Sequence, residues 1–571
     1  MTVYKMRIGN REYTEIGVVD SYNLKALPFP NKLNPVLSKL FNQDIFTYKD
    51  NIVDILHSSV RCMDVIPGVI VLNENKTYGK YKDKLLYKCV PDDKRLPIFL
   101  IPYKKKNGFN KNIKNKYVIF KFKSWDGKHP IATAVNVLGD TDKLDNFYEY
   151  QLYCKSLYAS IQNITKKAMK KLKEKTSDEY IDLIKSSHTN LKDYRDNRNI
   201  YTIDSSTSRD FDDAFDIEIN EDHTRIGIYI SNVSFWMDIM ELWDSFSNRI
   251  STIYLPDRKR PMLPTVLSDA LCSLTENDTR FAFEVSFIID NSSNKITNYQ
   301  FNNSIIKVKK NLRYDTDDLD KYSSYTDVLS TVIKMNRGKQ RYVESITTCH
   351  DVIAFLMITM NHYCAKELIK HNSGIYRIAK YNSDFKVPDN IPDNAKKFMK
   401  QWNSTGGKYC KFENKDEHEI LKLESYVHIT SPIRRLVDLL NIMKLQEKLG
   451  LYSMSESAKE FYKKWTSDDS IEYINVTMRS IRKVQNDCSL LKLCHDNSEL
   501  LNTLYDGFIF DKIIRNDGLY QYMVYLPDLN MSNRFTSRHD KDNMTIQKFK
   551  LFPFMDEVNL KKKIRLELQA I

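Results

Sequence analysis

Four aspartates within ten residues are the part of this sequence best suited to chemistry. They are Asp204, Asp210, Asp212 and Asp213, in the segment TIDSSTSRDFDDAFDI. Carboxylates held this close repel one another, so a folded cluster of them needs a cation. Hard oxygen ligands favour Mg²⁺, and two such ions about 3.5 to 4 Å apart can activate water and stabilise a leaving oxygen in phosphodiester cleavage. An acidic surface turn is the alternative interpretation.

The residues around the cluster indicate how it is held. The cluster follows the apolar start of a strand, TID, and precedes a second strand-like run, AFDIEI. This pattern predicts a structured loop between two strands. Upstream, residues 76–123 contain fifteen basic and three acidic residues. An acidic site combined with a basic module favours a metal-dependent enzyme that acts on nucleic acid.

The basic segment accounts for most of the net charge of +13, which comes from 87 Lys and Arg against 74 Asp and Glu. A lysine-rich stretch is commonly a solvated face, and that interpretation stays open. Aromatic residues such as Tyr78, Tyr87 and Tyr103 lie between the lysines, and single-stranded nucleic acid needs this mixture of cations for phosphates and rings for bases. Lys104, Lys105 and Lys106 are the candidate RNA-binding residues of this segment.

Several classes of protein are disfavoured. Neither GxGxxG nor GxxxxGK[ST] occurs, which argues against ATP-driven and nicotinamide chemistry. The nine cysteines form no CxxC pair, so we expect free thiols in a reducing compartment. No apolar run approaches the roughly 18 residues that span a bilayer, and the first residues do not resemble a signal peptide. We therefore expect an intracellular, cytoplasmic protein that does not bind membranes.

Three ordered motifs resemble those of the ribonuclease II/R (RNB) family of processive 3′-to-5′ exoribonucleases. The aspartate segment is similar to the family signature TIDxxxxxDxDDA. Residues 253–274, IYLPDRKRPMLPTVLSDALCSL, look like its YLPxxxxPMLPxxLSxxLCSL segment. Residues 426–435, YVHITSPIRR, followed by Asp438, look like its YxHxTSPIRRYxDL segment.

The resemblance implies a role for each matching residue. The four aspartates would hold the catalytic metal, and Asp212 would be needed for cleavage and not for RNA binding. Arg434 would contact the phosphate near the scissile bond, where a fixed guanidinium stabilises developing charge. Tyr254 would pack near the 3′-terminal nucleotide. Tyr314 is similar to another family aromatic over a shorter match, and a core position is equally compatible with it.

Length and periodicity predict a multidomain α+β protein. The resemblance identifies its central part as an RNB catalytic domain flanked by small OB-fold β-barrels. The expected boundaries are 1–59 for an N-terminal extension or reduced cold-shock-like barrel, 60–143 for a cold-shock/OB-type RNA-binding domain, 144–199 for a helical linker, 200–499 for the RNB domain and 500–571 for a C-terminal OB-type RNA-binding domain.

The chain also departs from the family pattern. The usual VHIADV-like strand is replaced by IYISNV, a glutamate pair in a later helix is absent, and three positions after SPIRR differ. The replacing residues are Tyr229, Asn232, Ala354, Phe355, Leu436, Ile442 and Met443. None of these positions is a metal ligand, so catalysis should survive, whereas product length and processivity are in question.

The leading hypothesis is a monomeric, hydrolytic 3′-to-5′ exoribonuclease. It would use Mg²⁺, with Mn²⁺ as an alternative, to degrade single-stranded RNA processively to nucleoside 5′-monophosphates. A catalytically weak RNB relative that acts as an RNA-binding or scaffolding protein is the second hypothesis, motivated by the departures. A DNA exonuclease is the third, because phosphate contacts do not distinguish the two sugars.

Overall fold

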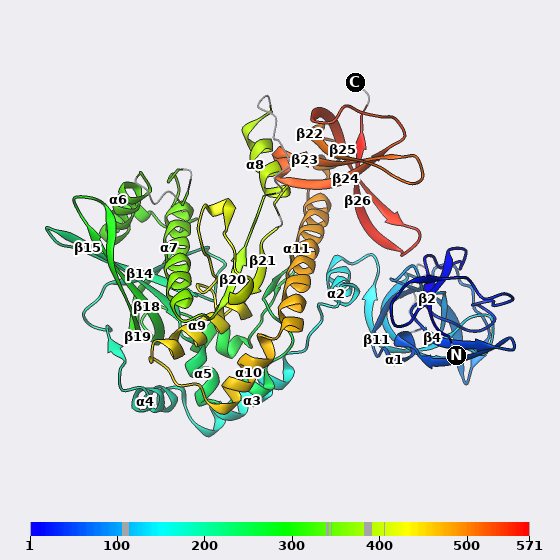
Figure 1. Ribbon diagram of the computed structural model, residues 1–571, viewed down its shortest axis with the longest axis horizontal. Coiled ribbons are helices and arrows are strands. Elements are labelled where there is room, and N and C mark those ends of the chain that lie inside the picture. The colour runs from blue at the N-terminus through cyan, green and yellow to red at the C-terminus, as the bar shows by residue number, and fades with distance from the viewer. Residues whose placement is uncertain are drawn as a thin grey trace. The chain divides into compact units, whose positions relative to one another are not determined.

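The computed structural model describes residues 2–105, 113–337, 342–343, 345–381, 391–404 and 406–569. Two compact units are present. The first comprises residues 1–158, 255–258 and 482–571, and the second comprises residues 159–254 and 259–481. The first unit carries most of its strands in small sheets, and the second is a larger assembly of sheet and helices (Figure 1). The fold is therefore multidomain α+β, as the sequence predicted.

Two small sheets occupy the N-terminal part of the first unit, and they share one hydrophobic core that includes Phe41, Phe99 and Phe120. The first sheet has the order β3-β2-β1-β4-β5. The second closes into a barrel because β6 pairs with both β10 and β8, and β11 pairs with β9. The elements are β1 (Val3–Ile8), β2 (Ile16–Asp20), β3 (Ala26–Leu27), β4 (Ile45–Lys49), β5 (Ile52–His57), α1 (Ser59–Cys62), β6 (Ile66–Ile70), β7 (Lys80–Tyr81), β8 (Lys84–Pro91), β9 (Phe99–Tyr103), β10 (Lys116–Ser124), β11 (Ile131–Asp140) and α2 (Leu144–Cys154).

The C-terminal part of the first unit is another five-stranded antiparallel sheet, with the order β24-β23-β22-β25-β26. Its two edges approach each other, since Asn533 Nδ2 of β24 donates to the Ile564 carbonyl of β26 at 3.4 Å. An antiparallel sheet of short strands whose edges meet is typical of a small β-barrel. They are β22 (Tyr505–Ile514), β23 (Tyr520–Leu526), β24 (Met531–Ser537), β25 (Thr545–Asp556) and β26 (Lys561–Leu568).

The sheet of the second unit is closed by one long strand. Strand β19 (Lys295–Arg313) pairs antiparallel with β18 up to Lys307 and parallel with β13 from Val308 onward. Along β15, Ile226, Ile228 and Ile230 enter one core while Tyr229 enters another, so both faces of the sheet are covered. The remaining strands are β12 (Lys192–Asp193), β13 (Ile200–Asp204), β14 (Asp213–Ile219), β15 (His223–Ser231), β16 (Ile253–Tyr254), β17 (Lys259–Arg260), β18 (Thr279–Asp290), β20 (Ile375–Ile378) and β21 (Lys408–Lys411).

Helices pack on one face of this sheet. The core that contains α6 and α7 includes Phe283 of β18, and the core that contains α5, α9 and α10 includes Phe281, which lies on the same face of that strand. The opposite face carries a smaller core of strand and loop residues that includes Ala282 and Tyr229. The helices are α3 (Gln162–Glu174), α4 (Ser177–Ser187), α5 (Val233–Ile239), a π-helical turn (Val266–Leu271), α6 (Ser323–Arg337), α7 (Cys349–Lys370), α8 (Asp393–Trp402), α9 (Leu436–Lys448), α10 (Glu456–Trp465) and α11 (Asp468–Asp496), which runs from the second unit into the first.

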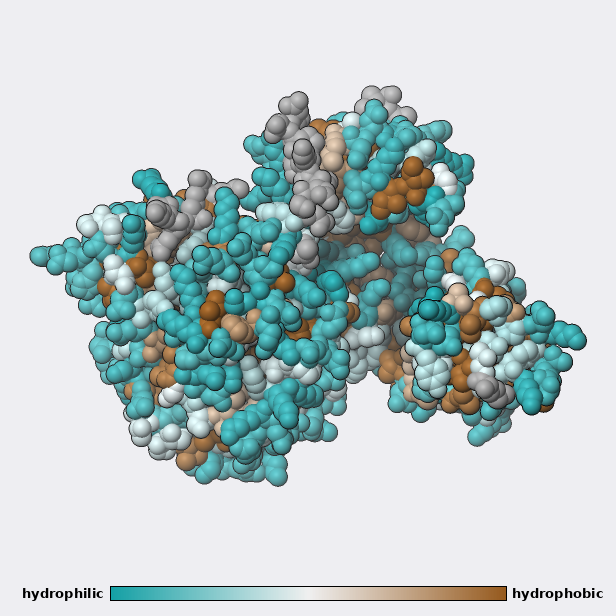
Figure 2. Space-filling view, viewed as in Figure 1, coloured by the Kyte–Doolittle hydropathy of each residue, from teal (hydrophilic) through white to brown (hydrophobic). Residues whose placement is uncertain are grey.

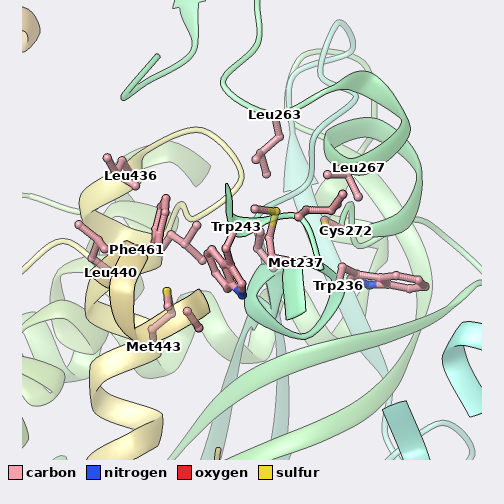
Figure 3. Close-up of a cluster of buried hydrophobic side chains, with 14 of the residues drawn as sticks. Trp236, Met237, Trp243, Leu263, Leu267, Cys272, Leu436, Leu440, Met443 and Phe461 are labelled. Carbon is pink, nitrogen blue, oxygen red and sulfur yellow. The ribbon is translucent and has the colours of Figure 1, made fainter. Parts of the chain in front are cut away.

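The core around α5 and α9 fixes the segment that carries the SPIRR motif. Figure 3 shows Leu436 and Leu440 of α9 in the same cluster as Trp236 and Trp243. Leu436 is fully buried and immediately follows the two arginines of the motif. Burial of large aliphatic and aromatic side chains contributes about 1.5 to 3 kcal/mol each, so the start of α9 is firmly anchored.

Helix α7 is long and apolar enough to cross a membrane by length and composition. In this structure 61% of its most apolar window is buried, which is also what the core helix of a globular domain shows. It begins with a capping box in which Thr348 and Asp351 satisfy each other's backbone N–H groups. The surface visible in Figure 2 is mostly hydrophilic, with scattered hydrophobic patches. All nine cysteines are free, as predicted.

Candidate active site

The acidic loop connects two neighbouring strands of the second unit. Strand β13 ends at Asp204, and β14 begins at Asp213. Asp204 lies opposite Arg313 of β19, and Asp213 lies opposite Ile230 of β15. Because strands on both sides hold these two positions, the sheet fixes the ends of the loop.

Hydrogen bonds and packing contacts from neighbouring segments hold the loop in place. Ser273 Oγ accepts a hydrogen bond from the Phe211 N–H at 3.0 Å and donates one to the Arg209 carbonyl at 2.9 Å. The Phe211 ring is buried in a core that also contains Leu274, and the Arg313 guanidinium lies 5.0 Å from the ring centroid. The segment is therefore an ordered loop, and an exposed acidic turn is excluded for Asp212, whose exposed fraction is 3%.

Asp212 is held by the SPIRR segment. The Ile433 N–H donates to Oδ1 at 2.8 Å, and Arg434 Nε donates to Oδ2 at 3.2 Å. Arg434 also donates through Nη2 to Ser431 Oγ at 3.0 Å, which limits the rotation of its guanidinium. The side chain of Arg434 remains 43% exposed, so the buried carboxylate and an accessible cation lie side by side.

Asp210 contacts a short hairpin. In that hairpin Tyr254 of β16 is paired with Lys259 of β17, so the two side chains lie on the same face. Lys259 Nζ lies 2.9 Å from Asp210 Oδ1 and 3.0 Å from Asp269 Oδ1. Burial raises the pKa of Tyr254, and the negative charge of Asp210 and a hydrogen bond to that carboxylate raise it further.

Three of the four aspartates resist ionisation. Burial raises the pKa of Asp204, Asp212 and Asp213 to about 7 in each case. Repulsion adds to this effect, from Asp212 for Asp204 and from Asp204 for Asp213, whereas Arg434 opposes it for all three. Carboxylate oxygens that repel one another are the kind of donor that Mg²⁺ fits.

The same carboxylates do not form a finished coordination shell. Among the residues that the structure describes, no three His, Cys, Asp or Glu side chains are gathered closely enough to hold a metal ion. Asp210 is engaged by Lys259, and Asp212 is engaged by Arg434. The structure thus brings the four aspartates to one loop and its two strand ends, with side-chain cations beside two of them.

Tyr314 lies next to the acidic loop at the end of β19. Its N–H donates to the Asp204 carbonyl at 3.1 Å, so the backbone of Tyr314 is tied to the first aspartate. Its ring lies 4.0 Å from that of His350 and packs partly buried against the core that contains α7. The position therefore combines proximity to the loop with partial burial.

The predicted lysines of the basic segment follow β9 in the first unit. Lys104 is exposed. Lys105 Nζ lies 3.1 Å from Asn75 Oδ1 and 5.1 Å from the centroid of the Tyr87 ring. Lys106 lies outside the described residues.

Sequence reasoning missed three side chains that hold this site. Lys259 and Ser273 stand inside the second motif, where nothing in their spacing singles them out. Arg313 donates through Nη1 to the Ser205 carbonyl at 2.9 Å, and its charge acts on Asp204. The parallel register of β13 with β19 places Arg313 opposite Asp204, and this register cannot be predicted from the sequence of either strand alone.

Two positions that depart from the family pattern lie in buried polar networks. Tyr229 donates its hydroxyl to Asp216 Oδ1 at 2.9 Å, and Arg225 pairs with the same carboxylate. Asn232 Nδ2 lies 3.2 Å from both Asn303 Oδ1 and Gln446 Oε1. The polar side chains at both departing positions therefore have hydrogen-bond partners.

The other two principal departures are core positions. Phe355 of α7 is fully buried and lies 5.3 Å from the ring of Tyr342. Leu436 packs in the cluster of Figure 3. Apolar side chains at these places contribute packing, so they leave the hydrogen bonds of Asp212 intact.

Comparisons with known proteins find related domains in two parts of the chain. Residues 191–322 match the family model of the RNB domain, and residues 86–149 match that of the Dis3-like cold-shock domain 2. A ribonuclease R of Chlamydia pneumoniae is 28% identical over 308 residues, which cover 42% of this chain and 45% of that protein. The chain spans less than two-thirds of the length of each ribonuclease R relative considered.

Two solved structures share the fold. The structure of Mycoplasma genitalium RNase R in complex with ribose methylated single-stranded RNA has a TM-score of 0.65 at 15% identity, covering 99% of this chain and all of that one. Yeast Ssd1, described as a pseudonuclease, has a TM-score of 0.58 at 14% identity and covers 93% of this chain and 78% of its own. At these identities the likeness establishes the architecture alone.

Proposed function

We propose that the chain is a 3′-to-5′ exoribonuclease of the RNB family that hydrolyses single-stranded RNA to nucleoside 5′-monophosphates in a Mg²⁺-dependent, processive reaction. Mn²⁺ would serve as an alternative ion. We also propose that the protein is a monomer and that it acts in the cytoplasm. The observation that carries the proposal is the buried carboxylate of Asp212 beside the exposed guanidinium of Arg434.

Asp212 is the residue on which turnover should depend most. It is nearly inaccessible, and the Ile433 N–H and Arg434 fix both of its oxygens. A carboxylate held this rigidly can orient a reacting water, because its position is not lost to side-chain motion. The same burial keeps it from contributing much RNA contact area, so the residue should matter for cleavage more than for binding.

Arg434 is placed to contact the scissile phosphate. Its guanidinium is partly exposed, bonded to Asp212 on one side and to Ser431 on the other. A planar guanidinium binds phosphate oxygens in a fixed geometry and stabilises charge that builds up as the P–O bond breaks. The part of the Arg434 guanidinium that remains exposed is available to contact the substrate.

Tyr254 and Tyr314 supply aromatic surface near the loop. Tyr254 is 42% exposed and adjoins Asp210, so its ring suits stacking against a terminal base. Tyr314 is more buried and is tied to Asp204 through its backbone. We assign Tyr254 to the 3′-terminal nucleotide and Tyr314 to support of the loop and its neighbouring base.

The four aspartates would hold the divalent cation, on the basis of their oxygen donors and of the pKa values raised by mutual repulsion. When bound, the ion supplies positive charge that favours ionisation of the attacking water and stabilises the transferring phosphoryl group. Water adds to the terminal phosphorus, the bond to the upstream 3′-oxygen breaks, and that oxygen takes up a proton. The products are a nucleoside 5′-monophosphate and an RNA shorter by one nucleotide.

The small barrels would bind the RNA that leads to this site. In the second sheet Lys123 Nζ lies 4.3 Å from the centroid of the Tyr81 ring, and Lys105 lies close to Tyr87. In the C-terminal sheet the Arg565 guanidinium lies 4.7 Å from the Phe552 ring. Cations next to rings suit phosphates and bases of a single strand, so residues 60–143 and 500–571 are assigned to RNA binding, with residues 1–59 as an additional barrel.

The test is a time course on 5′-labelled single-stranded RNA with Mg²⁺ or with excess chelator. We expect metal-dependent conversion to a short labelled end product without a ladder of intermediates. Asp212→Asn should lose at least about 10²-fold in turnover and bind RNA as tightly as the wild type. Unchanged cleavage by Asp212→Asn would contradict the assignment of this site as the nuclease active site.

A catalytically weak RNB relative is the second candidate. Two observations favour it: side-chain cations engage Asp210 and Asp212, and the same architecture occurs in the pseudonuclease Ssd1. On this reading RNA binds tightly and no end product forms with either Mg²⁺ or Mn²⁺. A matched DNA oligomer in the same assay separates both candidates from a DNA exonuclease.

A further inference from the structure

Lys259 is a cation built into the acidic site. It lies 2.9 Å from Asp210 Oδ1 and 3.0 Å from Asp269 Oδ1, and its side chain is 23% exposed. The hairpin register that pairs it with Tyr254 directs it to the face on which Asp210 lies. A partly buried ammonium between two carboxylates is a stable arrangement, because each acid neutralises part of the charge.

The position of this ammonium bears on how Asp210 can act. A carboxylate oxygen that accepts from an ammonium at 2.9 Å has less negative charge available for a second cation on the same oxygen. A lysine and a divalent ion near one carboxylate also repel each other.

We propose that Lys259 competes with the divalent cation for Asp210, and that Asp269 provides the alternative partner that accepts the ammonium when the ion binds. Lys259 thereby sets the metal affinity of the site. This inference rests on the proposed function, because it assumes that the aspartates bind a divalent ion. Lys259 is a positioning residue in this scheme, since it acts through Asp210.

Asp269 is well placed for the exchange. It lies in the π-helical turn, and its Oδ1 also accepts from Ser268 Oγ. The ammonium already contacts both acids, so a small rotation of the lysine suffices to favour one over the other. No main-chain movement is required.

The test measures binding of Mn²⁺ alone to the RNA-free full-length protein, by electron paramagnetic resonance of the free ion. Lys259→Met removes the charge and keeps the length of the side chain. We expect it to bind Mn²⁺ about three- to tenfold more tightly than the wild type, the range for loss of one partly exposed like charge. Lys444→Met is the control, because Lys444 pairs with Glu447 at 2.6 Å elsewhere in the second unit.

A second variant tests the exchange. Asp269→Asn should weaken Mn²⁺ binding in the wild type because Lys259 is then left with Asp210 alone. In the Lys259→Met background the same change should have a smaller effect, and the difference measures the coupling between the two residues. Equal effects in both backgrounds overturn the role of Asp269.

The outcomes separate this inference from the proposed function. Equal Mn²⁺ affinity of the wild type and Lys259→Met, with normal RNA degradation, overturns the competition and leaves the nuclease intact. Weaker binding by Lys259→Met overturns it as well, because the lysine would then support the ion. Failure of both proteins to bind Mn²⁺ above the level of Asp212→Asn overturns the metal site and the competition together.

Discussion

Asp212 and Asp213 are adjacent in the chain, but their side chains have different surroundings. Asp212 accepts hydrogen bonds from the Ile433 N–H and Arg434, whereas Asp213 starts β14 and is affected first by burial and then by the charge of Asp204. Burial raises the pKa of both to about 7. Their ionisation near neutral pH therefore costs folding free energy unless a cation compensates it.

This cost predicts a pH dependence of stability. The folded-state pKa of about 7 lies above the unfolded value of 3.8, so these groups cost nothing below about pH 4, and stability falls as pH rises from about 4 to about 7 and then levels off. Melting temperatures of chelator-treated protein should decrease from pH 5.5 to 8, and Mg²⁺ should raise them more at pH 8. Scanning fluorimetry in the two buffers measures both effects.

The matched variants of this prediction are two Asp→Asn changes. Asp213→Asn removes one of the buried carboxylates and should flatten the pH dependence. Asp244→Asn changes an exposed aspartate of the same unit and should leave it as in the wild type. A pH dependence that is identical in all three proteins would show that the loop carboxylates are not its source.

At the scale of elements, α7 holds the chain that leads to the SPIRR motif. Asn361 is 2% exposed, accepts from the Ile429 N–H at 2.9 Å through Oδ1 and donates to the Tyr426 hydroxyl at 3.0 Å through Nδ2. The neighbouring His362 bonds the Ser425 carbonyl through Nδ1 at 3.0 Å. One helix turn therefore fixes residues 425–429, from which the Arg434 segment continues.

Asn361→Ala should be strongly destabilising. It leaves a buried N–H and a buried hydroxyl without this partner, which costs about 1 to 3 kcal/mol. Urea denaturation followed by fluorescence measures the free energy of unfolding. The exposed Asn163 of α3 provides the control, and Asn163→Ala should change stability by less than about 0.5 kcal/mol. Equal losses in the two variants would contradict the bracing role of α7.

The elements also show where sequence reasoning reaches its limit. The spacing of Asp204, Asp210, Asp212 and Asp213 between two strand-like runs was enough to predict a loop between strands, and this prediction is confirmed. The contact of Lys259 with Asp210 depends on how two short strands pair in a hairpin. Pairing register is set by long-range packing, and a single sequence carries little information about it.

The same limit applies to the closed sheet. The run SNKITNYQFNNSIIKV, residues 293–308, is recognisable as strand-forming, but nothing in it shows that β19 continues to Arg313 or that its first part pairs with β18 and its last part with β13. The apolar character of α7 was also underestimated, because polar residues interrupt its sequence while its helical packing buries 61% of the most apolar window.

At the scale of the whole molecule, the excess of positive charge lies largely in the first unit, in the window of residues 76–123. Binding of a single strand by such a surface releases counterions, so affinity falls as salt rises. The exposed Lys104 and its neighbour Lys105 are the described lysines of this window that we assign to RNA.

Lys104→Gln combined with Lys105→Gln should make the salt dependence of RNA binding shallower. Each phosphate contact on a single strand contributes about 0.7 to the slope of log K against log salt, so the double variant should lose about 1.4. Fluorescence anisotropy at several KCl concentrations, with chelator to prevent cleavage, gives the slope. The exposed lysines of α10, Lys459 and Lys463, changed to Gln together, should leave it unaltered. An unchanged slope in the first variant would remove these lysines from the RNA path.

The ion pair between Asp212 and Arg434 joins residues 222 positions apart in the chain. During synthesis at about 5 to 20 residues per second, roughly 10 to 45 seconds separate the appearance of the two side chains. A ribosome-bound chain that ends before Arg434 therefore has its aspartates without the arginine. Under the proposed function, such a nascent chain lacks the guanidinium that would contact the scissile phosphate, so it should not degrade the messenger from which it is being translated.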